Sequence, residues 1–237
     1  MAELFDETWF YAPVKAEGEA VALSDDEAHH ALRVLRLRPG MEIMVTNGAG
    51  SVFRCRLDAA RDSAKAYPLE RILHEPEPPG LSLALCMLKG RDVELPVEAA
   101  CEFAVREIFL LLTDHSGEFR GQKFDRMLER LEQKSEAALK QAKKAWRTVV
   151  HAPQDLRPWR EARLSIPLAV AHPGRDTVPS PLPRELHVLT GPEGGFSGKE
   201  LDYLFGQPNA YRLSLGSTRL RAVHAPIAAL GNLSARR

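Results

Sequence analysis

The sequence predicts an α/β protein in which a small, mostly β domain precedes a larger domain built on a mostly parallel sheet. Before residue 74, short apolar runs are separated by turn signals at Pro39-Gly40 and Asn47-Gly48. An Asn-Gly pair between two such runs is a strong hairpin signal. After residue 80, runs rich in leucine, isoleucine and valine alternate with helical stretches, which is typical of a parallel sheet covered by helices.

Length and composition are those of an ordinary globular protein. The 237 residues suffice for two domains with buried cores, and 44% are hydrophobic and 27% charged. No apolar run approaches the roughly 20 residues that span a bilayer, and the acidic N-terminus lacks the basic region of a secretory signal. The three cysteines are far apart and odd in number, which argues against disulfides and against a zinc site. We expect a cytoplasmic protein with buried, reduced thiols, no metal and no membrane contact.

The formal net charge of zero conceals an uneven distribution of charge. Residues 1–28 carry eight acidic residues against Lys15 alone, whereas residues 29–61 carry six arginines and two acidic residues. Residues 211–237 contain five arginines and no acidic residue. Such segregation creates local basic faces, so a neutral net charge does not exclude a nucleic-acid partner.

One helix is predicted among the N-terminal strands. Residues 25–37, DDEAHHALRVLRL, place Ala31, Val34, Leu35 and Leu37 at helical spacing. The N-terminal domain is therefore predicted to combine short strands with a single short helix.

A stiff linker is predicted between the two domains. The segment HEPEPPG, residues 74–80, packs three prolines and a glycine into seven positions. We therefore predict a first domain over residues 1–73 and a second over residues 81–237.

The second domain is predicted to hold short strands and one long helix. The helix covers residues 123–146, where apolar residues recur at helical spacing. Arg126, Arg130 and Lys134 line another face of it, which is either a solvated face or a surface for a polyanion. The strands correspond to the apolar runs at residues 81–88, 107–112, 147–151, 166–171, 186–190 and 211–215.

A glycine-rich loop, within the stretch LTGPEGGFSGKE, follows the predicted strand at residues 186–190. It is not a phosphate-binding P-loop, because Glu193 stands where that motif needs glycine and Glu200 where it needs Ser or Thr. The dinucleotide fingerprint G-x-G-x-x-G is missing too. Ser197 and Glu200 form a capping box that starts a helix. GPEGGF is either a tight strand-to-helix turn or a loop that approaches a ligand closely.

A second glycine-bearing loop follows the next strand, in YRLSLGSTRLR, where Gly216 ends the apolar run. Loops that follow parallel strands lie at the same carboxyl edge of the sheet, which is where open α/β sheets bind ligands. An adenosine-like group, held by backbone amides and carbonyls, suits such a site better than a phosphate.

Several motifs resemble one known family in the family's own order. The motifs WFYAP, HHALRVLRLRPG and TNGAG are similar to its PUA-like N-terminal domain. LKG at residues 88–90, DHS at 114–116 and ALKQAKKAW at 138–146 are similar to its catalytic domain. LTGPEGGFSGKE and LSLGSTRLR match its two signature loops. The family is that of the bacterial 16S ribosomal RNA (uridine-N3) methyltransferases, which belong to the SPOUT superfamily.

This resemblance implies a fold, a cofactor and an assembly. Residues 1–73 would form a PUA-like β-barrel that binds RNA, and residues 81–237 a SPOUT domain with a C-terminal trefoil knot. The protein would act as a homodimer with its sites at or near the interface. The cofactor would be S-adenosylmethionine, held by residues carried over from the two loops: Thr190, Gly191, Pro192, Glu193, Gly194, Gly195, Leu213, Leu215, Gly216 and Leu220.

The implied reaction methylates N3 of a uridine in 16S ribosomal RNA of the small subunit. Arg219 and Arg221 follow the second loop directly. They either stabilise the anion that forms when N3 loses its proton or contact the RNA backbone. His224 is either the proton acceptor or a structural residue.

RNA contact is also expected from the N-terminal domain. Arg33, Arg36 and Arg38 lie on and just after its predicted helix, without an offsetting acidic residue. They either contact phosphates or pack their aliphatic stems over the domain.

The chain departs from the family pattern near the implied site. Ala99 stands where the family usually has lysine, and Ala222-Val223-His224 stands where it usually has Thr-Glu-Thr. Two hypotheses follow: an active methyltransferase, or a drifted homologue that binds RNA, with or without the cofactor, and does not transfer the methyl group.

Overall fold

The computed structural model describes residues 7–60, 63–77, 80–119 and 121–237. Residues 1–6, which include part of the acidic N-terminus, and residues 78–79 of the predicted linker lie outside the described residues. The chain divides into two compact units. The first consists of Met1–Pro78 with Glu136–Arg147, and the second of Pro79–Ser135 with Thr148–Arg237.

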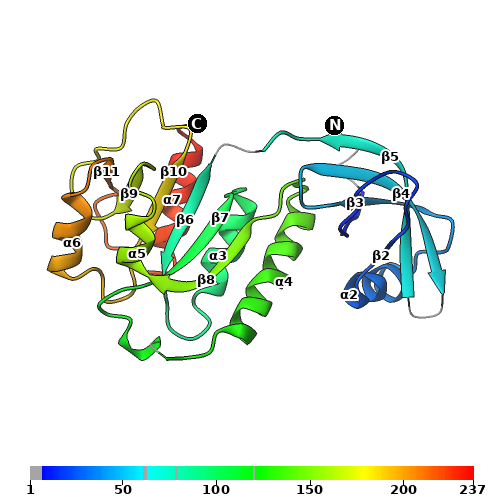
Figure 1. Ribbon diagram of the computed structural model, residues 1–237, viewed down its shortest axis with the longest axis horizontal. Coiled ribbons are helices and arrows are strands. Elements are labelled where there is room, and N and C mark those ends of the chain that lie inside the picture. Colours follow the sequence, from blue (N-terminus) through cyan, green and yellow to red (C-terminus); the bar gives the residue numbers. More distant parts are fainter. Residues whose placement is uncertain (1–6, 61–62, 78–79, 120) are drawn as a thin grey trace. The chain divides into compact units, whose positions relative to one another are not determined.

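The first unit is built on a five-stranded sheet with the order β1-β3-β4-β5-β2 (Figure 1). β1 pairs with β3 in parallel, and the remaining pairs are antiparallel. Its core contains Phe10, Phe53 and Leu57, all buried. The strands are β1 (Trp9–Tyr11), β2 (Val21–Ala22), β3 (Glu42–Thr46), β4 (Ser51–Ala60) and β5 (Ser63–His74).

The hairpin predicted from the Asn-Gly pair is confirmed, because β3 and β4 pair antiparallel on either side of it. The side-chain Oδ1 of Asn47 accepts hydrogen bonds from the backbone N–H groups of Ala49 and Ser51, at 2.9 and 3.0 Å. Gly48 has a φ of +66°, which a residue without a side chain adopts at little cost. The local sequence therefore determines this turn.

The predicted helix over residues 25–37 is too long. The structure has a short helix α2 (Asp25–His29), capped by Ser24, and a π-helical turn η1 (His30–Val34). Arg36 then adopts a φ of +55°, which ends the helical path. The predicted spacing also fails for Val34 and Leu35, which are exposed.

The second unit is an α/β domain, as predicted, with six parallel strands in the order β11-β9-β10-β6-β7-β8. The strands lie close to the predicted apolar runs. They are β6 (Leu81–Cys86), β7 (Glu107–Leu112), β8 (Val149–Asp155), β9 (Leu168–Ala171), β10 (Leu186–Thr190) and β11 (Ala210–Leu213).

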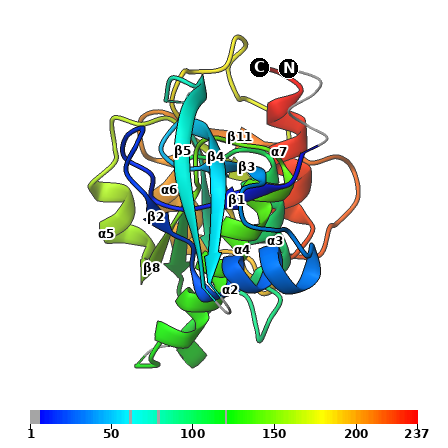
Figure 2. The ribbon, with the colours of Figure 1, turned by 90° about the vertical axis from the view of Figure 1, so that its right-hand side faces the viewer.

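Helices cover both faces of this sheet (Figure 2). On one face, Trp159 of α5 (Leu156–Glu161) and Leu204 of α6 (Gly198–Phe205) join a buried cluster with side chains of β6, β7, β9 and β10. On the other face, α7 (Ala225–Ser234) packs on β10 and beside α3 (Glu94–Glu102). The near-continuous apolar strands follow from this double coverage.

The long predicted helix is shorter than expected. α4 spans Asp125–Gln141 rather than 123–146, and Lys143, with a φ of +52°, lies just beyond its end. Its basic face is largely paired with α3. Arg130 lies 3.4 Å from a carboxylate oxygen of Glu94, and Lys134 lies 2.9 Å from one of Glu98. These pairs favour the interpretation of a surface face over that of a polyanion site.

The three cysteines are free and buried, as predicted. Burial raises the pKa of the Cys55 thiol to about 12 and that of Cys86 well above its usual range, so neither forms a thiolate near neutral pH. Within the described residues, no helix is long and apolar enough to cross a membrane. These same residues contain no group of three or more His, Cys, Asp or Glu that could hold a metal ion.

Candidate functional site

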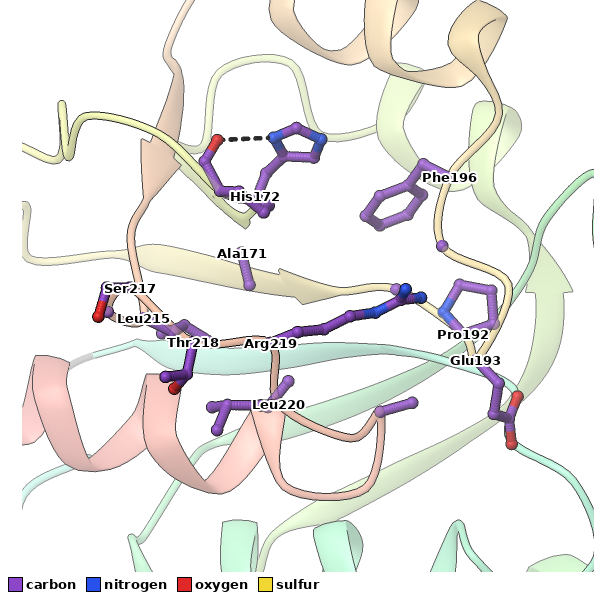
Figure 3. A pocket seen from close by; sticks show the side chains of 16 residues that line it. Ala171, His172, Pro192, Glu193, Phe196, Leu215, Ser217, Thr218, Arg219 and Leu220 are labelled. Atoms are coloured by element: carbon purple, nitrogen blue, oxygen red, sulfur yellow. Dashed lines mark hydrogen bonds between the residues drawn. The ribbon is translucent and has the colours of Figure 1, made fainter.

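A pocket of about 520 Å³ lies at the carboxyl ends of β9, β10 and β11 (Figure 3). The three strands are parallel, so the loops that follow them meet at one edge of the sheet. The wall consists of residues 171–173 after β9, residues 191–193, 195 and 196 after β10, and residues 215–220, 222 and 225 after β11. The predicted meeting of the two glycine loops at one edge is confirmed.

The loop after β10 is shaped by its glycines. A side chain at Gly191 would place its Cβ 3.1 Å from the ring of Phe196, closer than ordinary van der Waals contact. Gly195 has a φ of +72°, and its N–H donates a 2.9 Å hydrogen bond to the carbonyl of Pro192. The glycines therefore allow a tight turn along the wall of the pocket.

Glu193 ties this loop to the segment that follows β6. Its Oε1 accepts a 2.9 Å hydrogen bond from the backbone N–H of Lys89. Lys89 belongs to the LKG motif, which follows β6. This hydrogen bond therefore joins β6 and β10 just beyond their carboxyl ends.

A second set of hydrogen bonds ties the same loop to the segment that follows β7. Ser197 and Glu200 form the predicted capping box of α6. The buried carboxylate of Glu200 also accepts a 2.9 Å bond from the backbone N–H of Asp114, and the Ser197 hydroxyl donates to the Asp114 carboxylate at 2.6 Å. The Nδ1 of His115 donates to the carbonyl of Gly195 at 3.0 Å. The DHS motif therefore supports the loop from outside the pocket.

The loop after β11 supplies the charged wall. Gly216 has a φ of +110°, which lets the chain turn back along the pocket. Arg219 extends across the pocket, with its guanidinium pointing toward Pro192 (Figure 3). Ser217 and Thr218 bring hydroxyl groups to the same wall.

The loop after β9 forms a third wall that the sequence reasoning missed. No motif in the sequence marks His172 and Pro173, yet both line the pocket. Nδ1 of His172 lies 3.0 Å from the carbonyl oxygen of Pro173 and 3.3 Å from Nη1 of Arg212, which itself donates to that carbonyl at 2.6 Å. The rule that ligands bind beyond the carboxyl ends of strands could have indicated this wall.

The predicted cofactor residues fall into two groups. One group lines the pocket: Gly191, Pro192, Glu193, Gly195, Leu215, Gly216 and Leu220. Thr190 and Leu213, the last residues of β10 and β11, are fully buried behind it. Gly194 faces the ring of His115 instead.

The predicted catalytic residues are separated by the structure. Arg219 lines the pocket. Arg221 and His224 are exposed and lie between the pocket-lining residues and α7, without contributing to the wall themselves. Ala222 and Ala225, which flank them, do line it.

The predicted RNA-binding residues belong to the first unit. Arg33 lies in η1, and Arg36 and Arg38 lie in the turn that follows. All three are exposed.

The pocket has the features that a nucleoside-type cofactor requires. Its volume lies within the range of small-molecule sites, about 300–1,000 Å³. Its wall combines bare backbone at Gly191 and Gly216 with apolar side chains such as Leu215 and Leu220. Behind the wall, Oγ1 of Thr190 is buried and finds no hydrogen-bond partner among the residues that the structure describes. These residues fit S-adenosylmethionine.

Comparisons with known proteins agree with this geometry. Residues 75–234 match the family described as RNA methyltransferase domain, and residues 23–66 match the RNA methyltransferase PUA domain. The ribosomal RNA small subunit methyltransferase E of Synechocystis is 30% identical, over 94% of this chain and 76% of that protein. Its counterpart in Mycobacterium bovis is 28% identical, over 94% of this chain and 89% of that protein.

A solved structure supports the fold. It is the crystal structure of a ribosomal RNA small subunit methyltransferase E from Neisseria gonorrhoeae bound to S-adenosyl methionine. The two chains are 21% identical and superpose with a TM-score of 0.81, over 97% of each. The fold agrees with the family matches in both units. This chain therefore belongs to the RNA methyltransferase family of the ribosomal RNA small subunit methyltransferases E.

Proposed function

We propose that this protein transfers a methyl group from S-adenosylmethionine to N3 of a uridine in 16S ribosomal RNA of the small subunit. The observation that carries the proposal is the pocket at the carboxyl ends of β9, β10 and β11, where both signature loops of the family face one cavity. Family membership supports the choice of cofactor and of RNA as substrate.

The cofactor would be held mainly by backbone. Gly191 and Gly216 leave amides and carbonyls open at the wall, while Leu215 and Leu220 supply apolar contact. His172 would contact the cofactor from the wall that follows β9. When bound, S-adenosylmethionine supplies a methyl group already activated by a sulfonium centre, so this chain needs no side-chain nucleophile.

The protein's chemical task is to prepare uridine N3. This nitrogen carries a proton and becomes a good nucleophile only when that proton leaves. Arg219, whose guanidinium reaches across the pocket, would stabilise the negative charge that then develops on the uracil oxygens. His224, exposed just before α7, would accept the proton. The pocket walls would align the two reacting atoms.

RNA would also contact parts of the chain beyond the pocket. Arg221 is exposed beside the pocket-lining segment and would contact the RNA backbone. In the first unit, the exposed Arg33, Arg36 and Arg38 would contact phosphates.

The proposal extends to assembly and location. Exposed apolar side chains on and beside α3, Leu95 at 48% and Phe103 at 36%, support a homodimer that buries this helix. The strand order, with β10 between β6 and β9 and β11 beyond β9, supports a C-terminal trefoil knot. With a 16S ribosomal RNA substrate, the protein would act in the cytoplasm. The domain boundaries proposed are residues 1–73 and 81–237, joined by residues 74–80.

Calorimetry with S-adenosylmethionine tests the cofactor, and mass spectrometry of the RNA tests the reaction. We expect saturable binding with a Kd well below 1 mM. A Kd of 1 mM is a weak affinity and corresponds to a binding free energy of about 4 kcal/mol. Small-subunit RNA from cells with and without the gene should differ in one methylated uridine. Binding of the cofactor with no difference in the RNA would favour the drifted homologue, and no binding of the cofactor would refute the methyltransferase.

A further inference from the structure

The turn after η1 exposes apolar side chains in the middle of a basic segment. Val34 is 58% exposed, Leu35 36% and Met41 45%. They alternate with arginines, and no acidic residue occurs between residues 28 and 41. We call this surface the basic-apolar patch. It consists of Arg33, Val34, Leu35, Arg36, Arg38 and Met41.

The core of the first unit does not need these apolar side chains. Ala31 is fully buried, and Leu32 and Leu37 pack against the same core, so the segment is already anchored on both sides of Val34 and Leu35. Two backbone bonds hold the turn: Leu35 N–H to the carbonyl of His30 and Leu37 N–H to that of Ala31, each at 2.9 Å. Val34 and Leu35 are therefore held outward on a fixed backbone.

The backbone of the patch is itself unusual. The π-helical turn His30–Val34 inserts an extra residue, and such turns occur frequently at functional sites. Arg36 follows with a φ of +55°, a conformation that strains a residue with a side chain. Glycine would adopt it without this cost. A strained arginine at the tip of an exposed turn indicates that its side chain has a use there.

The side chains of the patch indicate the chemical nature of its partner. Arginines around an apolar centre match a polyanion that also offers flat apolar faces, which is RNA with unstacked bases. Apolar side chains such as Leu and Met insert between bases in known nucleic-acid complexes. The neighbouring acidic residue Glu42 lies 3.7 Å from Arg54, which offsets its charge. The patch also lies within residues 23–66, which match the RNA methyltransferase PUA domain.

We propose that Val34, Leu35 and Met41 form an apolar wedge that contacts unpaired bases of the RNA substrate while the surrounding arginines hold its phosphates. This inference rests on the proposed function, because the RNA that the wedge contacts is the substrate proposed above. The wedge would let the first unit recognise unpaired bases and not only the charge of the RNA. Arg38 fixes Met41 in place, since its backbone N–H lies 3.3 Å from the Met41 sulfur.

The experiment measures the affinity of full-length protein for naked 16S ribosomal RNA at several salt concentrations. The variant Val34→Ser/Leu35→Ser should bind about tenfold more weakly with an unchanged salt slope, because no phosphate contact is lost. Arg36→Gln should reduce the steepness of log affinity against log salt concentration by about one, which corresponds to one counterion released less. Leu69→Ser is the matched control, because Leu69 is 45% exposed on β5 of the same unit, outside the patch, and should bind like the wild type.

A further variant separates recognition from folding. Arg36→Gly should raise the melting temperature, because it relieves the strained φ, and should nevertheless weaken RNA binding. If Val34→Ser/Leu35→Ser binds RNA like Leu69→Ser, the wedge is refuted. It is equally refuted if the double variant loses binding to anionic vesicles, or loses self-association, while its RNA affinity stays unchanged. Wild-type protein that neither binds nor methylates 16S ribosomal RNA would refute the proposed function instead.

Discussion

Glu200 and Asp114 are joined across the sheet: Oε1 of the Glu200 carboxylate accepts a 2.9 Å hydrogen bond from the backbone N–H of Asp114. Its other oxygen accepts from the backbone N–H of Ser197 at 2.8 Å. One buried carboxylate therefore caps α6 and fixes the end of β7 beside the glycine loop. The geometry of the pocket depends on this connection.

Replacing Glu200 by Gln should destabilise the fold, because an amide nitrogen cannot accept a hydrogen bond and leaves one N–H unsatisfied. We expect a loss of about 1–3 kcal/mol in the free energy of unfolding, measured by urea denaturation. Glu193→Gln is the control. Glu193 is exposed and uses a single oxygen, toward Lys89, so its amide can keep that bond, and we expect a change within about 0.5 kcal/mol. Equal losses in the two variants would contradict this account.

Gly195 should tolerate no side chain without cost. Its φ of +72° strains any residue with a Cβ, although no described atom lies within 4 Å of the Cβ that alanine would add. Gly195→Ala should lower stability by about 1 kcal/mol and weaken binding of S-adenosylmethionine, measured by thermal unfolding and calorimetry. Gly198→Ala is the matched control, because Gly198 has equal space, no positive φ and a place at the start of α6. It should leave binding unchanged and stability equal or slightly higher.

His187 should make the protein less stable in mild acid. Burial lowers the pKa of this histidine to about 4, and the charges of Arg163 and Arg160 contribute further. The native state therefore keeps His187 neutral, whereas the unfolded chain takes up a proton below a pKa of about 6.5. Stability should fall as the pH drops from 6.5 to 4, by up to about 3 kcal/mol from this residue.

The measurement is the free energy of unfolding against pH for wild type and His187→Phe. The ring of His187 lies 5.5 Å from that of Phe109 and 5.3 Å from that of Trp159, so phenylalanine has aromatic neighbours. In the variant, the free energy of unfolding should fall less steeply between pH 6.5 and 4 than in the wild type. An identical slope in both proteins would rule out His187 as its source.

Arg219 and Arg221 should differ in what they contribute to turnover. Arg219→Ala should lower kcat by about a hundredfold, as expected for the loss of one charge-stabilising donor in the pocket. Arg221→Ala, at an exposed position outside the wall, should mainly raise KM for RNA. Neither should change the affinity for S-adenosylmethionine by more than a few-fold. Steady-state methylation assays that show the same pattern for both variants would contradict the division of roles.

Local signals in the sequence predicted the parts of the fold that local interactions determine. The Asn47-Gly48 hairpin and the Ser197–Glu200 capping box form from neighbouring residues, and both are present. The helix at residues 25–37 was predicted too long because its apolar spacing continues to Leu37. The left-handed Arg36 that ends the helical path carries no glycine signal.

The site could be predicted only where a motif marked it. The two glycine loops were found, but the wall at His172 and Pro173 was not, because strand order decides which loops meet. β9 lies between β10 and β11 in the sheet, although it precedes both in the chain. In the same way, the spacing of Arg219 and Arg221 does not reveal that Arg219 is the one that lines the pocket.

The most direct test of the central claim is methylation of purified small subunits from cells that lack the gene, with labelled S-adenosylmethionine and purified protein. The methylated nucleoside is then identified by mass spectrometry against authentic standards. The account predicts that label enters 16S ribosomal RNA as 3-methyluridine, and that Arg219→Ala reduces its incorporation. Label in another nucleoside, or incorporation by wild-type protein no faster than without protein, would contradict it.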